Sequence, residues 1–265
     1  MRAFLILILL FFSYANAQHD NYPKDYFISP LDIPLKISGT FAELRSNHFH
    51  AGLDIKTNQK VGLPVKASAS GYVSRIKISH YGCGKALYVT HPNGYTSVYA
   101  HLKTFSPAIE AYVKKQQYKK KSYEIELFPK PGLLNIIQDR IVAYSGNSGG
   151  SGGPHLHFEI RDNAQRPINP MLFGIDIEDT RRPLVKSIYV YPIGNNAHVN
   201  QLHKKQKLTL KYIEKGIYEA EHIEAMGDIG FGIQTTDKQN LSENANGVYN
   251  IKTVSYTHLT LPTIA

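Results

Sequence analysis

Two histidines separated by one residue, His155 and His157, have a spacing that suggests chemistry. They lie in the segment GGPHLHFEI, which is typical of a β-strand that leaves a flexible loop. Side chains two apart on a strand point to the same face, so the two imidazoles would project together. Paired imidazoles can bind zinc through their ring nitrogens. An H-x-H pattern is weakly specific by itself, and two surface histidines on an edge strand are the alternative.

A second candidate pair is formed by His50 and Asp54 in the segment HAGLD. In a straight strand these two residues would be about 13 Å apart, which is too far for one metal ion. Gly52 lies between them, and glycine tolerates backbone conformations that let the chain bend. We therefore expect a bend that brings both side chains together. His48 forms another H-x-H with His50, but His50 alone has the H-x-G-x-D relation.

A third candidate, His101, lies at the end of the alternating stretch TSVYAHL. Strict alternation places Val98, Ala100 and Leu102 on one face of a strand, with Tyr99 and His101 on the other. His101 could therefore enter a polar cleft. Taken alone, it is more simply interpreted as an exposed residue.

Short strands and turns must position these residues. The patterns predict strands at 64–69, 71–76, 85–90, 95–102, 141–144 and 156–161. Asn93-Gly94 between two alternating runs indicates a hairpin turn. Residues 106–140 form a Lys-rich insertion with short helices expected at 107–116 and 132–138, and the Gly/Ser-rich loop 145–154 is expected to form a wall of the cleft.

A boundary near Asp179–Pro183 precedes a second β-rich region. We expect strands at 184–191, 207–212 and 216–221, and a further strand at Val248–Val254. About 100 residues are usual for a seven-stranded sandwich, so residues 184–254 are predicted to form a partial β-sandwich-like domain. The last residues, 255–265, contain no charge and resemble the translated readthrough of a sequencing adapter, so we interpret them as a non-native tail; a genuine terminal strand is the alternative.

Together these motifs resemble the lysostaphin-type zinc endopeptidases, which cut the peptide cross-links of bacterial peptidoglycan. The resemblance covers roughly residues 27–172. It is carried by HFHAGLDI, by the strand-and-hairpin stretch from PVKASASGYVSRI to KALYVTHPNGYTSVYAHL, by SGNSGGSGGPHLHFEI, and by their order. Three separate motifs in this order are far more specific than any one of them.

The resemblance implies a mainly β fold: a compact antiparallel β-sheet peptidase domain with a short-helix insertion, spanning residues 18–180. It implies a Zn²⁺ ion held by His50, Asp54 and His157, with His101 and His155 catalytic and unligated. Hydrolysis would then use a metal-activated water, with one free histidine as general base and the other stabilising the oxyanion or protonating the leaving amine. The sequence leaves open which histidine does which.

The first residues have the anatomy of a secretory signal peptide. Arg2 precedes the apolar run Ala3–Phe12, and Ala15-Asn16-Ala17 is a small-residue cleavage site, so residues 1–17 are predicted to be removed. No later segment is long and apolar enough to span a membrane, so we expect an exported protein, periplasmic or extracellular, without stable membrane insertion.

Composition excludes some of the remaining classes of protein and of binding partner. The chain has 265 residues, a formal net charge of +9 and a single cysteine, Cys83, which excludes an internal disulfide framework. The lysine run 114–121 is either a solvated face or an attraction for anionic envelope polymers. No nucleic-acid-binding motif is present, and export argues against such a partner.

These observations lead to a zinc metalloendopeptidase whose partner is peptidoglycan. The main alternative is a non-catalytic wall-binding or regulatory protein on the same fold, and the presence of all five expected side chains favours the enzyme. A peptidase that acts on other Gly-rich proteins is a third possibility. The sequence makes no prediction of oligomeric state.

Overall fold

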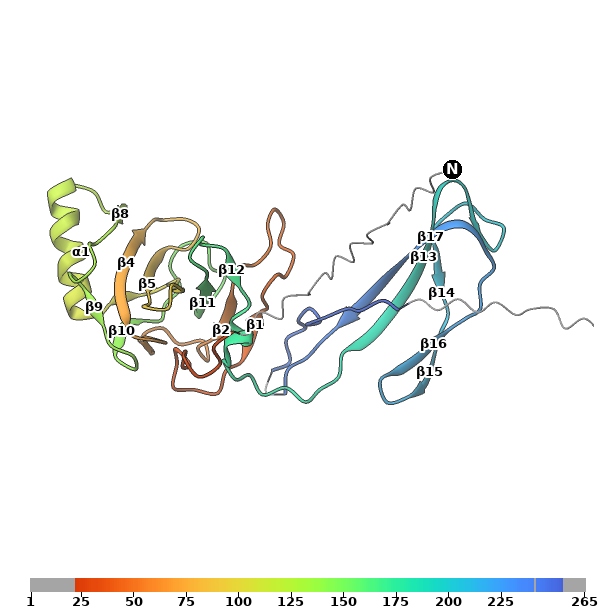
Figure 1. Ribbon diagram of the computed structural model, residues 1–265, viewed down its shortest axis with the longest axis horizontal. Helices are drawn as coiled ribbons and strands as arrows, with labels where there is room; N and C mark the ends of the chain where they lie inside the picture. The colour runs from red at the N-terminus through yellow and green to blue at the C-terminus, as the bar shows by residue number, and fades with distance from the viewer. Residues whose placement is uncertain (1–21, 241, 255–265) are drawn as a thin grey trace, which may run out of the picture.

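The computed structural model describes residues 22–240 and 242–254. A compact part built from residues 22–177 and a narrow β-ribbon built from residues 184–236 lie along the long axis of the molecule (Figure 1). The predicted signal peptide, 1–17, and the predicted non-native tail, 255–265, fall outside the described residues. Within the described chain, no helix has the length and apolar character that a transmembrane span requires.

One antiparallel sheet organises the compact part, in the order β1-β2-β11-β6-β5-β4-β8, with β12 pairing to β11 and β9 to β4. This order places β2 and β6, distant in sequence, on either side of β11, so the segments that carry the candidate residues become neighbours. The strands are β1 Ile37–Gly39, β2 Leu53–Lys56, β4 Gly71–Ile78, β5 Lys85–Thr90, β6 Thr96–Ala100, β8 Ile125–Leu127, β9 Asn135–Ile136, β11 His155–Arg161 and β12 Pro167–Ile168.

The main apolar core covers one face of this sheet. Leu156, Phe158 and Ile160 of β11 are fully buried in that core. Because side chains alternate along a strand, His155, His157 and Glu159 project from the opposite face. A smaller sheet in the order β3-β10-β7 adds β3 Pro64–Lys66, β7 Thr104–Phe105 and β10 Ile141–Tyr144, and the 3-10 helix η1 spans Pro170–Phe173.

The hairpin expected at Asn93-Gly94 is confirmed, with β5 and β6 paired up to Thr90 and Thr96. Gly94 has a φ of 87°, a left-handed conformation that glycine adopts without strain. The strands at 71–76, 85–90, 141–144 and 156–161 are confirmed, whereas those at 64–69 and 95–102 are shorter than expected.

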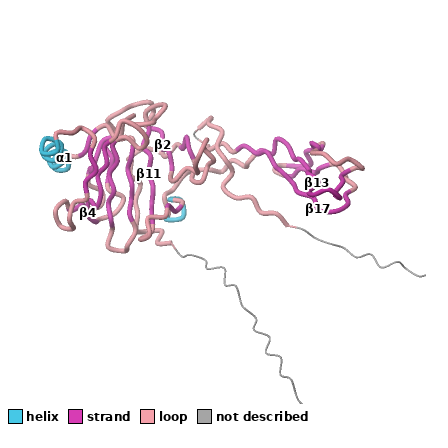
Figure 2. The backbone as a smooth tube through the Cα atoms, turned by 90° about the horizontal axis from the view of Figure 1, so that it is seen from above, coloured by secondary structure: helices cyan, strands magenta, loops and turns pink. Residues whose placement is uncertain are grey.

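The insertion 106–140 contains one helix, α1 Pro107–Lys120, at the end of the sheet that lies away from the ribbon (Figure 2). It begins with Pro at its first position, buries Ile109 and Val113, and ends where Lys121 turns left-handed. The helix expected at 132–138 is wrong. Residues Asn135–Ile136 pair with β4 instead, because ladder hydrogen bonds to β4 outweigh the propensity of a short segment that begins with Pro-Gly.

The ribbon consists of two long paired strands, β13 Leu184–Val199 and β17 Ala225–Thr236. The strand expected at 184–191 is therefore longer, and β17 was not expected at all. The rest of this part is β14 Gln206–Leu208 on the other side of β13, and a separate hairpin of β15 Leu210–Glu214 and β16 Ile217–Ala220.

After β17 the chain returns to the compact part. The buried side chain of Gln239 accepts from the backbone N–H of Ile37 at 2.8 Å and donates to the carbonyl of Leu35 at 2.5 Å. The strand expected at Val248–Val254 is wrong, since these residues form no strand. Residues 248–250 line a cavity against the compact part.

Candidate functional site

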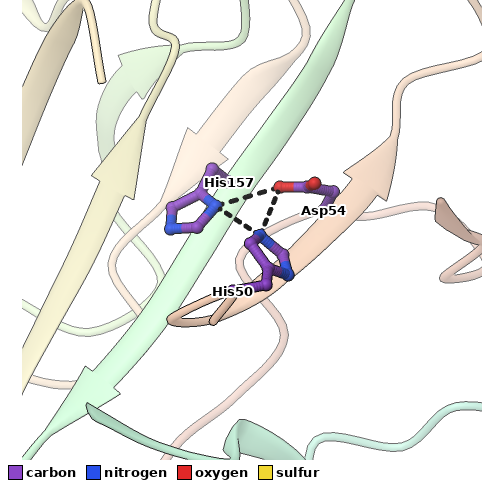
Figure 3. Close-up of side chains that lie close together, drawn as sticks. All are labelled: His50, Asp54 and His157. Carbon is purple, nitrogen blue, oxygen red and sulfur yellow. Dashed lines mark hydrogen bonds and ion pairs between the residues drawn. The ribbon is translucent and has the colours of Figure 1, made fainter. Parts of the chain in front are cut away.

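Three side chains that can bind metal converge on the sheet face opposite the main core: His50 before β2, Asp54 on β2 and His157 on β11 (Figure 3). His50 Nε2 lies 3.0 Å from Asp54 Oδ1 and 3.1 Å from His157 Nδ1. Asp54 Oδ1 lies 2.9 Å from His157 Nδ1. The ladder between β2 and β11 produces this meeting, because Asp54 and His157 are direct cross-strand partners.

The bend expected at Gly52 is present and brings His50 back to Asp54. Its physical reason differs from the expected one, because the φ of Gly52 is not positive. A Cβ at this position would lie 2.2 Å from the carbonyl oxygen of Phe158. Glycine is therefore needed here so that the bend can pack against the backbone of β11.

The outer nitrogen of each metal-site histidine already has a partner. His50 Nδ1 lies 2.8 Å from the carbonyl oxygen of Thr40, and His157 Nε2 lies 2.8 Å from Glu159 Oε1. Both partners accept hydrogen bonds, so a ring proton belongs on each outer nitrogen, and the inner nitrogens, once free of a proton, can offer lone pairs to a metal ion beside Asp54.

Two lone pairs and a carboxylate that face one another repel unless a cation lies among them. A tetrahedral zinc site with bonds of about 2.05 Å has ligand atoms about 3.3 Å apart. The observed separations of 2.9 to 3.1 Å are close to that spacing. The donor set of two imidazoles and one carboxylate therefore fits a zinc ion.

The charges around the cluster also favour a cation. Burial on its own would raise the pKa of Asp54, but hydrogen bonds with His155, His157 and His50 hold it far below its usual range. Burial would lower the pKa of His157, yet the Asp54 and Glu159 carboxylates raise it to about 9. A positive charge is stabilised at this point, and a proton and a metal ion would compete for it.

Arg45 binds the carboxylate oxygen of Asp54 that faces away from the histidines. Its guanidinium Nη2 donates to Asp54 Oδ2 at 3.2 Å and also lies 3.1 Å from Glu43 Oε2. The close approach depends on Gly39, where a Cβ would lie 2.4 Å from Nη2 of Arg45. One carboxylate oxygen of Asp54 thus faces the histidines while the arginine holds the other, which fixes the rotamer of Asp54.

The two remaining candidates lie beside this cluster. The rings of His101 and His155 are 4.7 Å apart, and both residues line a cleft of about 380 Å³ together with His50, Asp54 and His157. All five predicted site residues are therefore brought together. His48 lies at the rim of the same cleft, exposed, with its ring bonded to Asn47.

Tyr99 lies opposite Val98 and Ala100 as expected, but its face is the core face and not a polar one, and His101 does not share it. Tyr99 is fully buried in the main core, where its hydroxyl accepts from the backbone N–H of Ser68. On a regular strand His101 would follow Tyr99 into that core. Instead His101 has a φ of 57°, and this left-handed residue turns its side chain into the cleft. The core position is taken by Leu102.

Different partners give the two cleft histidines different proton affinities. Burial lowers the pKa of His101 to about 4, and its Nδ1 donates to the Ser148 carbonyl at 2.8 Å, which leaves a lone pair on Nε2. Burial would also lower the pKa of His155, but Asp54 and the Gly153 carbonyl raise it above its usual value. His101 is thus neutral at pH 7, whereas the pKa of His155 lies above its usual value.

Sequence reasoning missed Glu159, which is 2% exposed and lies between His157 and Arg161. Its position two residues after His157, on the same face of the strand, was the available signal. The Gly-rich loop forms a wall of the cleft as expected, with Gly150 donating to the carbonyl of Gly82 at 2.8 Å.

Residues 48–119 match the model of peptidase family M23. This segment is therefore similar to the peptidases of family M23. The M23 match includes His50, Asp54 and His101. Its curated relatives include the DD-carboxypeptidase/endopeptidase Mpg of Neisseria meningitidis serogroup B, 33% identical over 48% of this chain and 23% of the relative. Lysostaphin of Staphylococcus staphylolyticus is 30% identical over 55% of this chain and 23% of its own.

The peptidoglycan DD-endopeptidase ShyA of Vibrio cholerae is 27% identical over 61% of this chain and 33% of ShyA. The chain thus spans about a quarter to a third of the length of these M23 relatives. Among solved M23 structures, the catalytic domain of lysostaphin from Staphylococcus simulans has a TM-score of 0.38, at 23% identity over 52% of this chain and 89% of that domain.

Proposed function

We propose that residues 18–180 form a zinc-dependent endopeptidase domain that hydrolyses peptide cross-links of bacterial peptidoglycan. The observation that carries the proposal is the convergence of His50, Asp54 and His157, with both outer ring nitrogens already engaged. Relatives whose names state peptidoglycan endopeptidase activity support the substrate class. The partial β-sandwich-like domain expected over residues 184–254 is proposed only for the ribbon at 184–236, since the chain after β17 packs against the compact part.

A bound zinc ion would supply a Lewis acid for the scissile carbonyl and lower the pKa of the attacking water. His101 is suited to accept a proton, because it is neutral and its Nε2 lone pair is free. His155 takes the other role, with its Nδ1 bonded to the Gly153 carbonyl at 2.8 Å and its Nε2 directed toward Asp54. We therefore propose His101 as the general base and His155 as the donor to the oxyanion or the leaving amine.

The experiment is mass spectrometry of muropeptides after purified sacculi are incubated with the mature protein and zinc. New amine and carboxyl ends at a cross-link are the expected result, and His157→Ala protein is the matched control. Intact cross-links, with protein that binds zinc stoichiometrically and sediments with sacculi, would instead support a non-catalytic wall-binding protein.

A further inference from the structure

A second pocket adjoins the proposed catalytic cleft. It has a volume of about 510 Å³, and His155 lines both the pocket and the cleft. Lys36 and Lys56 also line the pocket, and the returning chain contributes Ser242 and Glu243 to its wall. A peptide that passes His155 in the cleft would therefore reach this pocket next.

The strand register explains why the lysines face the pocket. His157 pairs with Asp54 across the ladder, and His155 pairs with Lys56. Lys56 is thus two residues along β2 from Asp54, on the same face of the sheet. Lys36 lies on the neighbouring chain, where its carbonyl accepts from the backbone N–H of Lys56 at 2.8 Å.

The positive charge of this pocket is not neutralised by neighbouring carboxylates. Within the described chain, Lys36 and Lys56 take part in no ion pair, and the Lys56 ammonium donates to the neutral amide oxygen of Asn244 at 2.7 Å. The acidic residue that lines the pocket, Glu243, is already paired with Lys238 at 2.8 Å. Two ammonium groups beside a proposed active site therefore lack an anionic partner.

We propose that this pocket, through Lys36 and Lys56, binds a free carboxylate of the peptide substrate next to the bond that is cut. The inference rests on the proposed peptidase function and narrows its substrate class to peptides with an anionic group close to the scissile bond. A lysine ammonium contributes a mobile point charge with three donors, which suits a carboxylate that arrives on a flexible chain. Charge-assisted hydrogen bonds of this kind are stronger than neutral ones.

The test compares purified sacculi with the same sacculi after carbodiimide coupling to ammonia, which converts free carboxylates to amides. We expect the wild-type protein with zinc to cleave the untreated material at least about tenfold faster in kcat/KM, as one charge-assisted contact would contribute. The double variant Lys36→Gln/Lys56→Gln should lose this preference, mainly through a higher KM for untreated sacculi.

A matched control removes the same charge elsewhere. Lys114→Gln/Lys115→Gln changes two lysines of α1, both exposed and on the element at the far end of the sheet. This variant should retain the wild-type preference. If it loses the preference as the pocket variant does, general surface charge explains the effect and the pocket proposal is wrong.

A binding measurement separates this proposal from the proposed activity. Soluble muropeptides, untreated or amidated, are titrated calorimetrically into zinc-free protein. Tighter binding of untreated muropeptides that disappears in Lys36→Gln/Lys56→Gln supports the pocket, even if no cross-link is cut and the peptidase proposal fails. Equal affinity for both muropeptides overturns the pocket proposal, even if cleavage is observed.

Discussion

At the residue scale, His157 makes contacts with both of its ring nitrogens that no neighbouring residue can replace. Its Nδ1 faces Asp54 and His50, and its Nε2 is held by Glu159. The removal of its ring takes away one of three protein donors and leaves Glu159 without that partner.

We expect His157→Ala to lose both zinc and peptidase activity. Zinc content by inductively coupled plasma mass spectrometry and muropeptide release measure the two losses. His48→Ala is the control, because His48 lies in the same cleft outside the cluster and its loss should leave zinc bound. Stoichiometric zinc in the His157 variant would show that it is not a ligand.

His101 and His155 lead to a different expectation, because both lie beside the cluster with Nδ1 bonded to backbone carbonyls. His101→Ala and His155→Ala should each retain zinc and turn over at least about a hundredfold more slowly, as for the loss of a general acid or base. A folded variant that is purified without zinc would identify its residue as a ligand and overturn these roles.

At the scale of elements, β1 is an edge strand that the returning chain covers. The amide of Gln239 bonds the carbonyl of Leu35 and the N–H of Ile37, as the peptide group of a neighbouring strand would. Lys36, between them, belongs to the basic pocket, and Gly39 lies beside Arg45 and Asp54. The single side chain of Gln239 thus stabilises a strand that lies beside both sites.

Gln239→Ala should destabilise the protein by about 1–3 kcal/mol for each buried backbone group that is left unpaired. Urea unfolding monitored by tyrosine fluorescence measures the loss, since the chain has no tryptophan. Glu243→Gln, an exposed change in the same segment, should shift the midpoint little. Equal midpoints for wild-type and Gln239→Ala protein would show that this contact does not support β1.

At the scale of the whole molecule, metal binding should stabilise the compact part and leave the ribbon unaffected. The three proposed ligands come from the chain before β2, from β2 itself and from β11, so a bound ion would hold these segments together. A ligand that binds only the folded state stabilises that state by about 4 kcal/mol when the free ligand concentration is a thousand times the Kd.

Chelation should therefore lower the melting temperature of one of two thermal transitions by several degrees, and zinc should restore it. Magnesium should not restore the melting temperature, because imidazole ligands suit zinc and oxygen ligands suit magnesium. Differential scanning calorimetry tests this expectation. A melting curve that chelation leaves unchanged would contradict a metal site in this cluster.

Export is a second expectation for the whole protein. Cleavage after Ala17 would leave Gln18 as the first residue of the mature chain. N-terminal sequencing of the exported protein measures it directly, and a retained Met1 in a membrane fraction would contradict a cleavable signal peptide.

Local chemistry predicted the main strands of the compact part and singled out the five candidate site residues, whereas the role of each came from the resemblance to the lysostaphin-type endopeptidases. Period-two patterns and the Asn93-Gly94 turn depend on neighbours in sequence, so they can be recognised without the fold. The H-x-G-x-D and H-x-H motifs likewise combine residues that can bind a metal with spacings at which a bend or a strand brings their side chains to the same side.

Only the tertiary structure decided features that depend on neighbours distant in sequence. Gly52 is needed because β11 passes close to it, and β9 forms because β4 is there to pair with it. Strand β17 contains Gly230 and Gly232, which weaken strand propensity, yet a Cβ at either would lie 3.0 Å from Ile193 or Tyr191 of β13. Pairing with β13 thus outweighs the local preference.

The same reason explains His101 and Lys56. The sequence alone determined that a histidine follows Ala100, the last residue of β6, and the packing of Tyr99 and Leu102 into the core decided that His101 turns into the cleft. Lys56 is an ordinary charged residue in the sequence, and only the register of β2 with β11 places it beside His155. Residue types are local properties of the chain, whereas their meeting depends on long-range strand pairing, which no short window of sequence contains.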